Sequence, residues 1–232
     1  MYKFTLFLFV YRWYEDRYTG QDGYTVAVSS TPQGPFSTLA DTVHMSGAGR
    51  IGDYDIFIDD DGTGYHVRTG ITIEKLTSNY TAGTGQSVDI PNGGVEGPAM
   101  FKRNGIYYIL VGVGCCACRG GSNVIIYTAT NPLGPYTVQG DIGSNTTNGF
   151  HQSSPFNYVT HAQQTKVIPV PDGNGNVQYL WMGNQWVTSL TPQGTIGGPR
   201  NHDLLYWTIL QFNSTGGIQQ IEYSDTTQLI VP

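Results

Sequence analysis

The feature that most constrains this chain is a repeated pattern in which a turn rich in glycine and aspartate or asparagine precedes an aromatic strand. The pattern appears three times, at residues 59–67, 103–110 and 172–181. Asp-Gly and Asn-Gly pairs favour the positive φ angles of hairpin turns, and the alternating residues that follow are typical of half-buried strands. The repeats therefore predict an all-β fold of short strands.

A second repeat accompanies the first. Its form is Ser/Thr-x-Pro-x-Gly-Pro-aromatic, and it occurs at residues 30–36 and 130–136. Each copy follows a predicted strand, at 24–29 and 124–128. Two kinds of repeat at matching places indicate that one structural unit occurs several times along the chain.

Repeated four-stranded units of about 45–70 residues are typical of a β-propeller, because one unit cannot bury its faces alone and must stack on its neighbours. We divide a single domain, 1–232, into units at about 1–45 (without its opening strand), 46–92, 93–150 and 151–200, with closing strands in 201–232. A β-sandwich also has short strands at regular spacing, and the repeats leave that alternative open.

The composition limits the kind of partner. Charged residues make up 12% of the 232-residue chain, the formal net charge is −6, and the 11 basic residues are scattered. The phosphates of a nucleic acid would need Lys/Arg clusters, and no stretch is long and apolar enough to span a membrane. We expect a monomer with a neutral, polar ligand and with no nucleic-acid or membrane partner.

Three Asn-x-Ser/Thr sequons, at Asn79, Asn145 and Asn213, fit a secreted, extracellular glycoprotein, although such triplets also arise by chance. Residues 1–10 favour a buried strand over a secretion signal, because the apolar run is short and lacks a small-residue cleavage site.

The cysteines lie together as Cys115, Cys116 and Cys118. A structural zinc site usually needs a second group of ligands, and the chain offers none at a suitable spacing, so we expect no metal and no cofactor. Either two of these cysteines form a local disulfide that leaves one thiol, or one pairs with a cysteine outside this sequence.

Glu96 is the first candidate for chemistry. It lies in the run Gly-Gly-Val-Glu-Gly-Pro-Ala-Met-Phe, with no other charge before Lys102. A carboxylic acid in an apolar setting is suited to general-acid catalysis near neutral pH. The alternative is a turn glutamate that points into water.

Asp53 is the second candidate. It opens a strand predicted at 53–58, whose alternation puts Asp53, Asp55 and Phe57 on one face. A strand that opens with carboxylates and then turns apolar suits an inner propeller strand whose start lines the axial pocket. The acidic triplet at residues 59–61 is typical instead of a hairpin tip that is exposed to solvent.

Three motifs then stand in a characteristic order: Asp53-x-x-Ile-Phe-x-Asp-Asp-Asp-Gly-x-x-Tyr, Glu96-Gly-Pro-Ala-Met-Phe-Lys-Arg-Asn-Gly-x-Tyr-Tyr and Thr130-Asn-Pro-Leu-Gly-Pro-Tyr. In letters, order and spacing they resemble glycoside hydrolase family 43. The runs Ala162-Gln-Gln-Thr-Lys-Val-Ile-Pro and Met182-Gly-Asn-Gln-Trp are most similar to its exo-β-1,3-galactanase-like branch. The resemblance covers essentially all of 11–232.

The resemblance implies a five-bladed β-propeller, of which this chain would hold about four blades because the first is largely missing at the N-terminus. It also implies roles for three residues: Glu96 as the catalytic acid, Asp53 as the aspartate that tunes and orients that acid, and Gln163 as the glutamine that replaces the usual carboxylate base. The family inverts, so a water molecule must fit between the acid and the group that replaces the base. The implied substrate is an oligosaccharide or polysaccharide, β-1,3-galactan or a related galactose-containing plant glycan.

The resemblance indicates the substrate-binding residues less clearly than the catalytic ones. Trp186 is a pocket candidate from its Gly-Asn-Gln-Trp context, although aromatic residues in such folds more often pack between blades. Asn184 stands where an aspartate is common in the family, and Cys116 lies in a loop that departs from the branch's usual sequence. We take these three as candidate substrate-binding residues.

Two rival functions follow from the same residues. A catalytically inactive propeller that binds glycans gains weight from the missing blade and from the amide in place of a base. An arabinanase or xylosidase of the same family would need a first-blade aspartate that this chain does not show.

Overall fold

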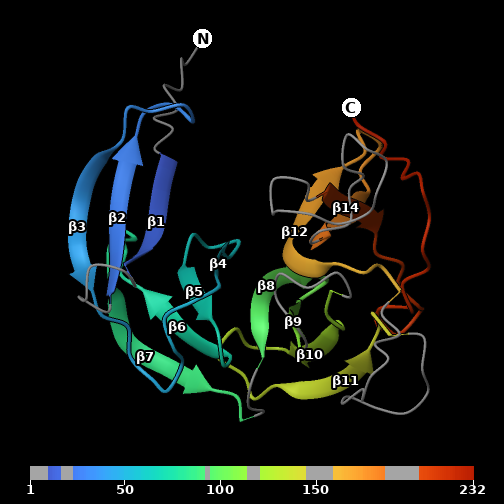
Figure 1. Cartoon of the computed structure of the whole chain (residues 1–232), viewed down its shortest axis with the longest axis horizontal. Helices are drawn as coiled ribbons and strands as arrows, with labels where there is room; N and C mark the ends of the chain where they lie inside the picture. The colour runs from blue at the N-terminus through green and yellow to red at the C-terminus, as the bar shows by residue number, and fades with distance from the viewer. Residues whose placement is uncertain (1–9, 17–22, 92–94, 114–120, 145–158, 186–203) are drawn as a thin grey trace, which may run out of the picture.

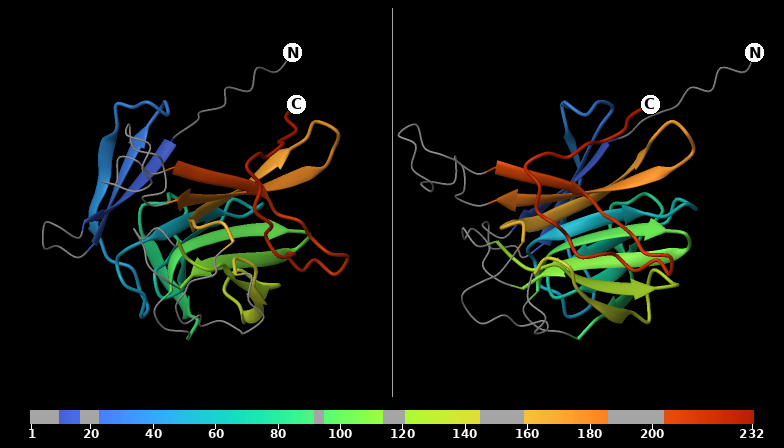
Figure 2. Two further views of the ribbon diagram at one scale, coloured as in Figure 1. Left: turned by 45° about the vertical axis from the view of Figure 1, so that its right-hand side comes forward. Right: turned by 90° about the vertical axis from the view of Figure 1, so that its right-hand side faces the viewer.

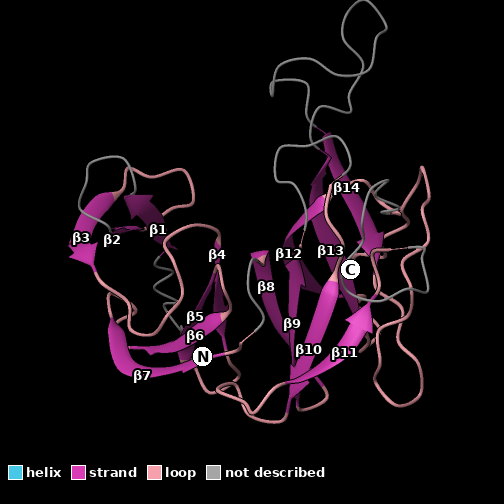
Figure 3. Ribbon diagram, turned by 60° about the horizontal axis from the view of Figure 1, so that its bottom comes forward, coloured by secondary structure: helices cyan, strands magenta, loops and turns pink. Residues whose placement is uncertain are grey.

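The computed structural model describes residues 10–16, 23–91, 95–113, 121–144, 159–185 and 204–232. In these residues the chain forms strands, turns and loops but no helix (Figure 3), and so none that could cross a membrane. The strand residues form four antiparallel sheets.

The sheets follow one another along the chain. The first holds β1 (Val10–Asp16), β2 (Gly23–Ser29) and β3 (Ser37–Val43), and the second holds β4 (Tyr54–Ile58), β5 (Gly64–Arg68), β6 (Thr72–Leu76) and β7 (Gly83–Asp89). The third holds β8 (Glu96–Arg103), β9 (Ile106–Gly112), β10 (Ile125–Ala129) and β11 (Thr137–Asp141), and the fourth holds β12 (Gln163–Pro171), β13 (Val177–Gln185) and β14 (Leu204–Ile209).

The four sheets succeed one another around an arc (Figures 1 and 2). In Figure 1, β4, β8 and β12 face the middle of the arc, and β3, β7 and β11 lie toward its outside. Strand β8 packs against both β4 and β12, although each of the three belongs to a different sheet. These inner strands therefore meet without sharing a hydrogen-bonded ladder.

Among the described residues the core consists of three clusters, each between two successive sheets. Strand β8 shows why: Phe101 faces the cluster shared with the fourth sheet, and its neighbour Met100 faces the cluster shared with the second. Both faces of the strand are buried, so it reads as a continuous apolar run. Four sheets with three buried interfaces do not fit a two-sheet sandwich, and the all-β prediction is confirmed with a propeller-type stacking.

The predicted turns are confirmed. Asn104 and Gly105 have φ angles of 50° and 77° and join β8 to β9, as a two-residue hairpin turn requires. The Gly-Pro repeats connect β2 to β3 and β10 to β11, and in each the glycine N–H donates to the carbonyl three residues earlier (3.1 Å at Gly34, 2.9 Å at Gly134).

One predicted boundary is wrong. The strand β14 at Leu204–Ile209 pairs with β13, so it completes the fourth sheet and does not begin a separate closing segment at 201. After it, residues 210–232 carry no further strand beyond the isolated bridge between Phe212 and Ile218. The predicted strand at 1–10 lies, apart from Val10, outside the described residues.

Candidate active site

A cavity of about 550 Å³ lies between the four sheets. All four sheets contribute to its lining: Trp13 and Tyr14 from β1, Gly52, Asp53 and Tyr54 at the start of β4, Gly97 and Pro98 from β8, and Gln163, Gln164, Thr165 and Asn184 from β12 and β13. The starts of the inner strands β4, β8 and β12 therefore line one pocket, as the sequence predicted for the strand that begins near Asp53.

Asp53 is fixed at both its backbone and its side chain. Its carbonyl oxygen accepts hydrogen bonds from Thr69, from the N–H at 2.9 Å and from Oγ1 at 3.1 Å. Its carboxylate oxygen Oδ2 accepts the N–H of Gly97 at 3.1 Å. The carboxylate of Asp53 thus contacts the backbone of the residue that follows Glu96. This contact fits a role for Asp53 in orienting the Glu96 side chain.

Glu96 is the first residue of β8 and is paired in register with Gly112 of β9. Its side chain is partly buried, so the alternative of a turn glutamate in open water does not fit. Glu96 is not itself a lining residue, but the two residues that follow it, Gly97 and Pro98, are. Glu96 is therefore adjacent in the chain to the lining of the cavity.

Gly97 allows the candidate residues to come together. Its φ is +59°, a conformation that residues with a side chain rarely adopt. A Cβ atom at this position would lie 2.8 Å from the carbonyl oxygen of Gln164, and 3.5 Å from Cγ and 3.6 Å from Nε2 of Gln163. Asp53 and Gln163 therefore approach the same glycine, next to Glu96. A glycine inside a predicted strand often marks a close backbone approach, and this signal could have identified Gly97 from the sequence.

Gln163 and Asn184 face each other across β12 and β13. Both line the cavity, and Gln163 is 6% exposed. Gln164 lines it as well, and its buried amide has no hydrogen-bond partner within the described part of the chain. The predicted residues Trp186 and Cys116 lie outside the described residues.

Sequence reasoning missed the aromatic residues of the cavity. Trp13, Tyr14 and Tyr54 all line it, and Tyr14 is 40% exposed. The guanidinium of Arg12 lies 5.7 Å from the centre of the Tyr14 ring and donates to its hydroxyl at 3.3 Å. The adjacent Trp-Tyr pair at the first strand was the available signal.

Deeper in the molecule, Asp55 is buried between the inner strands. Its carboxylate binds the ammonium group of Lys166 and accepts the N–H of Met100 at 2.8 Å. Burial raises the pKa of Asp55 above its usual value, although Lys166 opposes the shift. Asp53, Asp55 and Phe57 all contact the third sheet, so the prediction that they share one face is confirmed.

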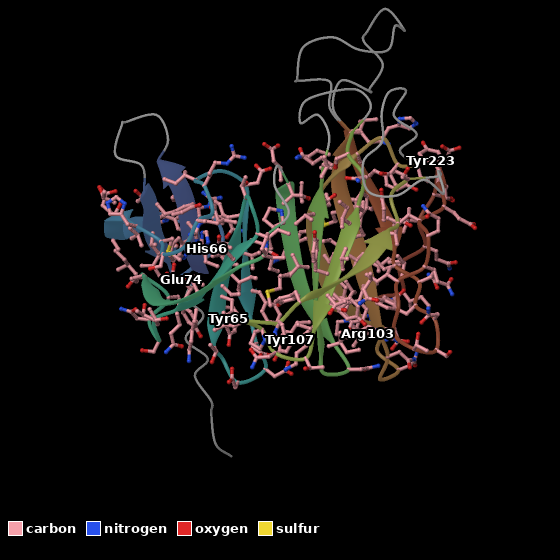
Figure 4. The ribbon with its side chains drawn as sticks, turned by 90° about the horizontal axis from the view of Figure 1, so that it is seen from below. Tyr65, His66, Glu74, Arg103, Tyr107 and Tyr223 are labelled. Carbon is pink, nitrogen blue, oxygen red and sulfur yellow. The ribbon has the colours of Figure 1, made fainter. Side chains whose placement is uncertain are left out.

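At the other end of β4 the expectation of a solvated acidic tip is wrong for Asp59. Its side chain is 8% exposed, and its oxygens accept hydrogen bonds from Lys102 Nζ at 2.7 Å and from the hydroxyl of Tyr107 at 2.5 Å (Tyr107 is labelled in Figure 4). Burial opposes ionisation there, but these bonds lower the pKa of Asp59.

Within the described ranges no three His, Cys, Asp or Glu side chains are grouped as metal ligands would be.

The family model of glycosyl hydrolases family 43 matches residues 5–196. The chain belongs to this family. Its match to the family covers most of the described strands and all three residues Asp53, Glu96 and Gln163.

A β-D-galactofuranosidase of Aspergillus niger is 35% identical over 127 residues, which are 50% of this chain and 36% of that protein. An exo-β-1,3-galactanase from Phanerochaete chrysosporium, solved with galactose, has a TM-score of 0.65 at 21% identity and covers 92% of this chain and 45% of its own. An exo-β-1,3-galactanase from Clostridium thermocellum has a TM-score of 0.63 at 24% identity, with 86% of this chain and 42% of its own covered.

A family 43 β-1,3-galactosidase solved with galactodeoxynojirimycin gives a TM-score of 0.65 at 19% identity, over 90% of this chain and 68% of that one. The chain thus spans 36% of the curated relative and less than half of each galactanase. At these identities the solved structures establish the fold, which is that of the family's propeller.

Proposed function

We propose that this chain is the catalytic propeller of an inverting glycoside hydrolase that removes galactose from the ends of β-1,3-galactan or related galactose-containing plant glycans. The observation that carries the proposal is the convergence of Asp53 and Gln163 on Gly97, the residue next to Glu96, in a cavity built by all four sheets. We infer that the four sheets are blades of a five-bladed ring formed by a single domain.

In this proposal Glu96 protonates the leaving glycosidic oxygen while a water molecule attacks the sugar from the opposite side. An inverting enzyme keeps its two catalytic groups about 6.5–9.5 Å apart so that this water fits between them. Gln163 is an amide and therefore a very weak base, so either its imidic-acid form takes the proton that the attacking water loses, or Gln163 only orients the water and that proton passes to solvent. Asp53 holds the backbone next to Glu96 and places a negative charge near it.

The cavity suits a sugar in size and lining. Its volume of about 550 Å³ is in the range of small-molecule sites, about 300–1,000 Å³. Tyr14, which is 40% exposed, offers a ring face to the C–H surface of a sugar, and the amide of Asn184 offers hydrogen bonds to its hydroxyl groups. A neutral ligand is also what the chain's few and scattered charges favour.

The choice of galactose rests on the relatives. Two of the similar structures are exo-β-1,3-galactanases, and one is a β-1,3-galactosidase. A second candidate substrate is a β-D-galactofuranoside, because the 35% identical relative is a β-D-galactofuranosidase. Both candidates place galactose in the cavity and differ in the ring that it must hold.

A substrate panel tests the proposal. Purified protein is incubated with β-1,3-galactobiose, an aryl β-D-galactofuranoside, an arabino-oligosaccharide and a xylo-oligosaccharide, and the products are followed by NMR. We expect galactose released first as the α-anomer, because inversion of a β-linkage gives that product. Retention of configuration would contradict the mechanism. Binding by calorimetry with no turnover of any sugar would support a glycan-binding propeller instead.

We also propose that the protein is a secreted glycoprotein. Asn79 and Asn213 lie exposed in turns, where their side-chain oxygens bond to the Thr81 and Thr215 hydroxyls of their own sequons. Asn145 lies outside the described residues. Expression in a eukaryotic secretory host, followed by enzymatic deglycosylation and mass spectrometry, should show a mass loss, and an unchanged mass would contradict this proposal.

A further inference from the structure

The inner strands β4, β8 and β12 carry the three proposed catalytic residues, one on or next to each strand. Because the strands belong to different sheets, no backbone ladder fixes their relative position. Asp55 supplies a connection between all three. It lies on β4, its oxygen Oδ2 accepts the N–H of Met100 on β8 at 2.8 Å, and its oxygen Oδ1 binds Lys166 of β12.

Lys166 reinforces the connection, because its Nζ also donates to the carbonyl of Ile56 on β4 at 3.1 Å. Each of the three connected residues follows a proposed catalytic residue by a few positions. On β4, Asp55 follows Asp53 by two, and on β8, Met100 follows Glu96 by four. On β12, Lys166 follows Gln163 by three. At about 3.3 Å per residue the connection lies roughly 7–13 Å from those residues.

We propose that Asp55, held by Lys166, is a positioning residue that sets the distances between Asp53, Glu96 and Gln163. The inference rests on the proposed function of this site. A buried carboxylate joined to one cation and one backbone N–H is weak evidence for stability, and in some proteins such a group specifies one arrangement of the elements that it joins. Displacement of a reacting group by about 1 Å can cost on the order of 100-fold in rate.

The chain provides a matched control at the far end of the same strands. Asp59 follows β4 and binds Lys102 of β8 at 2.7 Å, so this pair also joins the second and third sheets. Asp59 is six residues from Asp53, which is about 20 Å along a strand. Loss of this pair should affect stability without moving the cavity end of the strands.

The first measurement needs no substrate. The N–H of Gly97 donates to Asp53 across β8 and β4, so its hydrogen exchange reports how these strands are placed. We expect Asp55→Asn and Lys166→Met to speed exchange at Gly97 at least tenfold. Asp59→Asn, and Lys166→Arg, which keeps the charge, should leave it within about twofold of the wild type. Lys166 is 37% exposed, so its variants keep the test available if Asp55→Asn fails to fold.

The second measurement is the hydrolysis of β-1,3-galactobiose. We expect kcat to fall about 10- to 100-fold in Asp55→Asn and Lys166→Met, with KM within about threefold, because the sugar contacts remain while the reacting groups are displaced. Asp59→Asn and Lys166→Arg should keep kcat within about twofold.

Unchanged exchange at Gly97 in both Asp55→Asn and Lys166→Met would overturn the inference, and so would faster exchange with an unchanged kcat. Wild-type protein that hydrolyses none of the sugars would refute the proposed function. In that case the exchange measurement alone still decides whether Asp55 and Lys166 position the strands.

Discussion

His66 should make the stability of this protein fall in mild acid. It is fully buried on β5, between the first and second sheets (Figure 4), against the rings of Trp13, Tyr24 and Tyr54. Neither ring nitrogen has a hydrogen-bond partner in the part of the chain that the structure describes. Burial, together with the charge of Arg68, lowers the pKa of His66 from its ordinary 6.5 to about 3.

The sign follows from proton uptake. Between pH 6.5 and 3 the unfolded chain binds a proton at His66 that the folded protein does not, so stability is lost as the pH falls through this window. Each pH unit below 6.5 costs about 1.4 kcal/mol, which gives about 2 kcal/mol at pH 5. For a domain of this size that is a decrease in Tm of about 4–8 °C.

The assay is urea unfolding at pH 7.5 and pH 5.0 for the wild type and for His66→Phe, which keeps an aromatic ring but cannot take up a proton. We expect the wild type to lose about 2 kcal/mol more between the two pH values than His66→Phe does. The exposed His44 provides the control, and His44→Gln should lose as much stability as the wild type. Equal losses in wild type and His66→Phe would refute the reasoning.

Three further substitutions test the site. Gly97→Ala should destabilise the fold by at least about 1–2 kcal/mol, because its Cβ at positive φ meets the Gln164 carbonyl, and an unchanged urea midpoint would contradict this. Asp53→Asn should lower the rate of hydrolysis, because it alters the carboxylate that accepts the N–H of Gly97 next to Glu96; an unchanged rate would leave Asp53 a structural residue. Gln163→Ala should abolish hydrolysis and spare calorimetric binding of galacto-oligosaccharide, whereas equal loss of both would make Gln163 a substrate ligand.

The parts of the fold that depend on local sequence could be predicted. Hairpin turns such as Asn104-Gly105 are determined by backbone preferences of two residues, and strand alternation put Asp53 and Asp55 on one face correctly. The predicted unit boundary at residue 200 is wrong because the pairing of β14 with β13 depends on tertiary contacts, which local sequence preferences do not determine.

The sequence proposes the residues of the site, but it did not predict how they are brought together. Motif resemblance selected Asp53, Glu96 and Gln163, which lie more than a hundred residues apart at the extremes. The contacts that bring these residues together could not be predicted from the sequence, because they join segments that are far apart in the chain. The pair of Asp55 and Lys166 spans 111 residues, and Asp59 was taken as solvated because its partner Lys102 comes from another sheet.

The most direct test of the central claim is the hydrolysis of β-1,3-galactan by Glu96→Gln, with the exposed Glu222→Gln as the matched control. Loss of general-acid catalysis should lower the rate by about 10²–10⁴-fold, while Glu222→Gln keeps wild-type activity. An aryl galactoside with a good leaving group should lose less, because its departure needs little protonation. If Glu96→Gln hydrolysed galactan at the wild-type rate, Glu96 would not be the catalytic acid and the account of this site would be wrong.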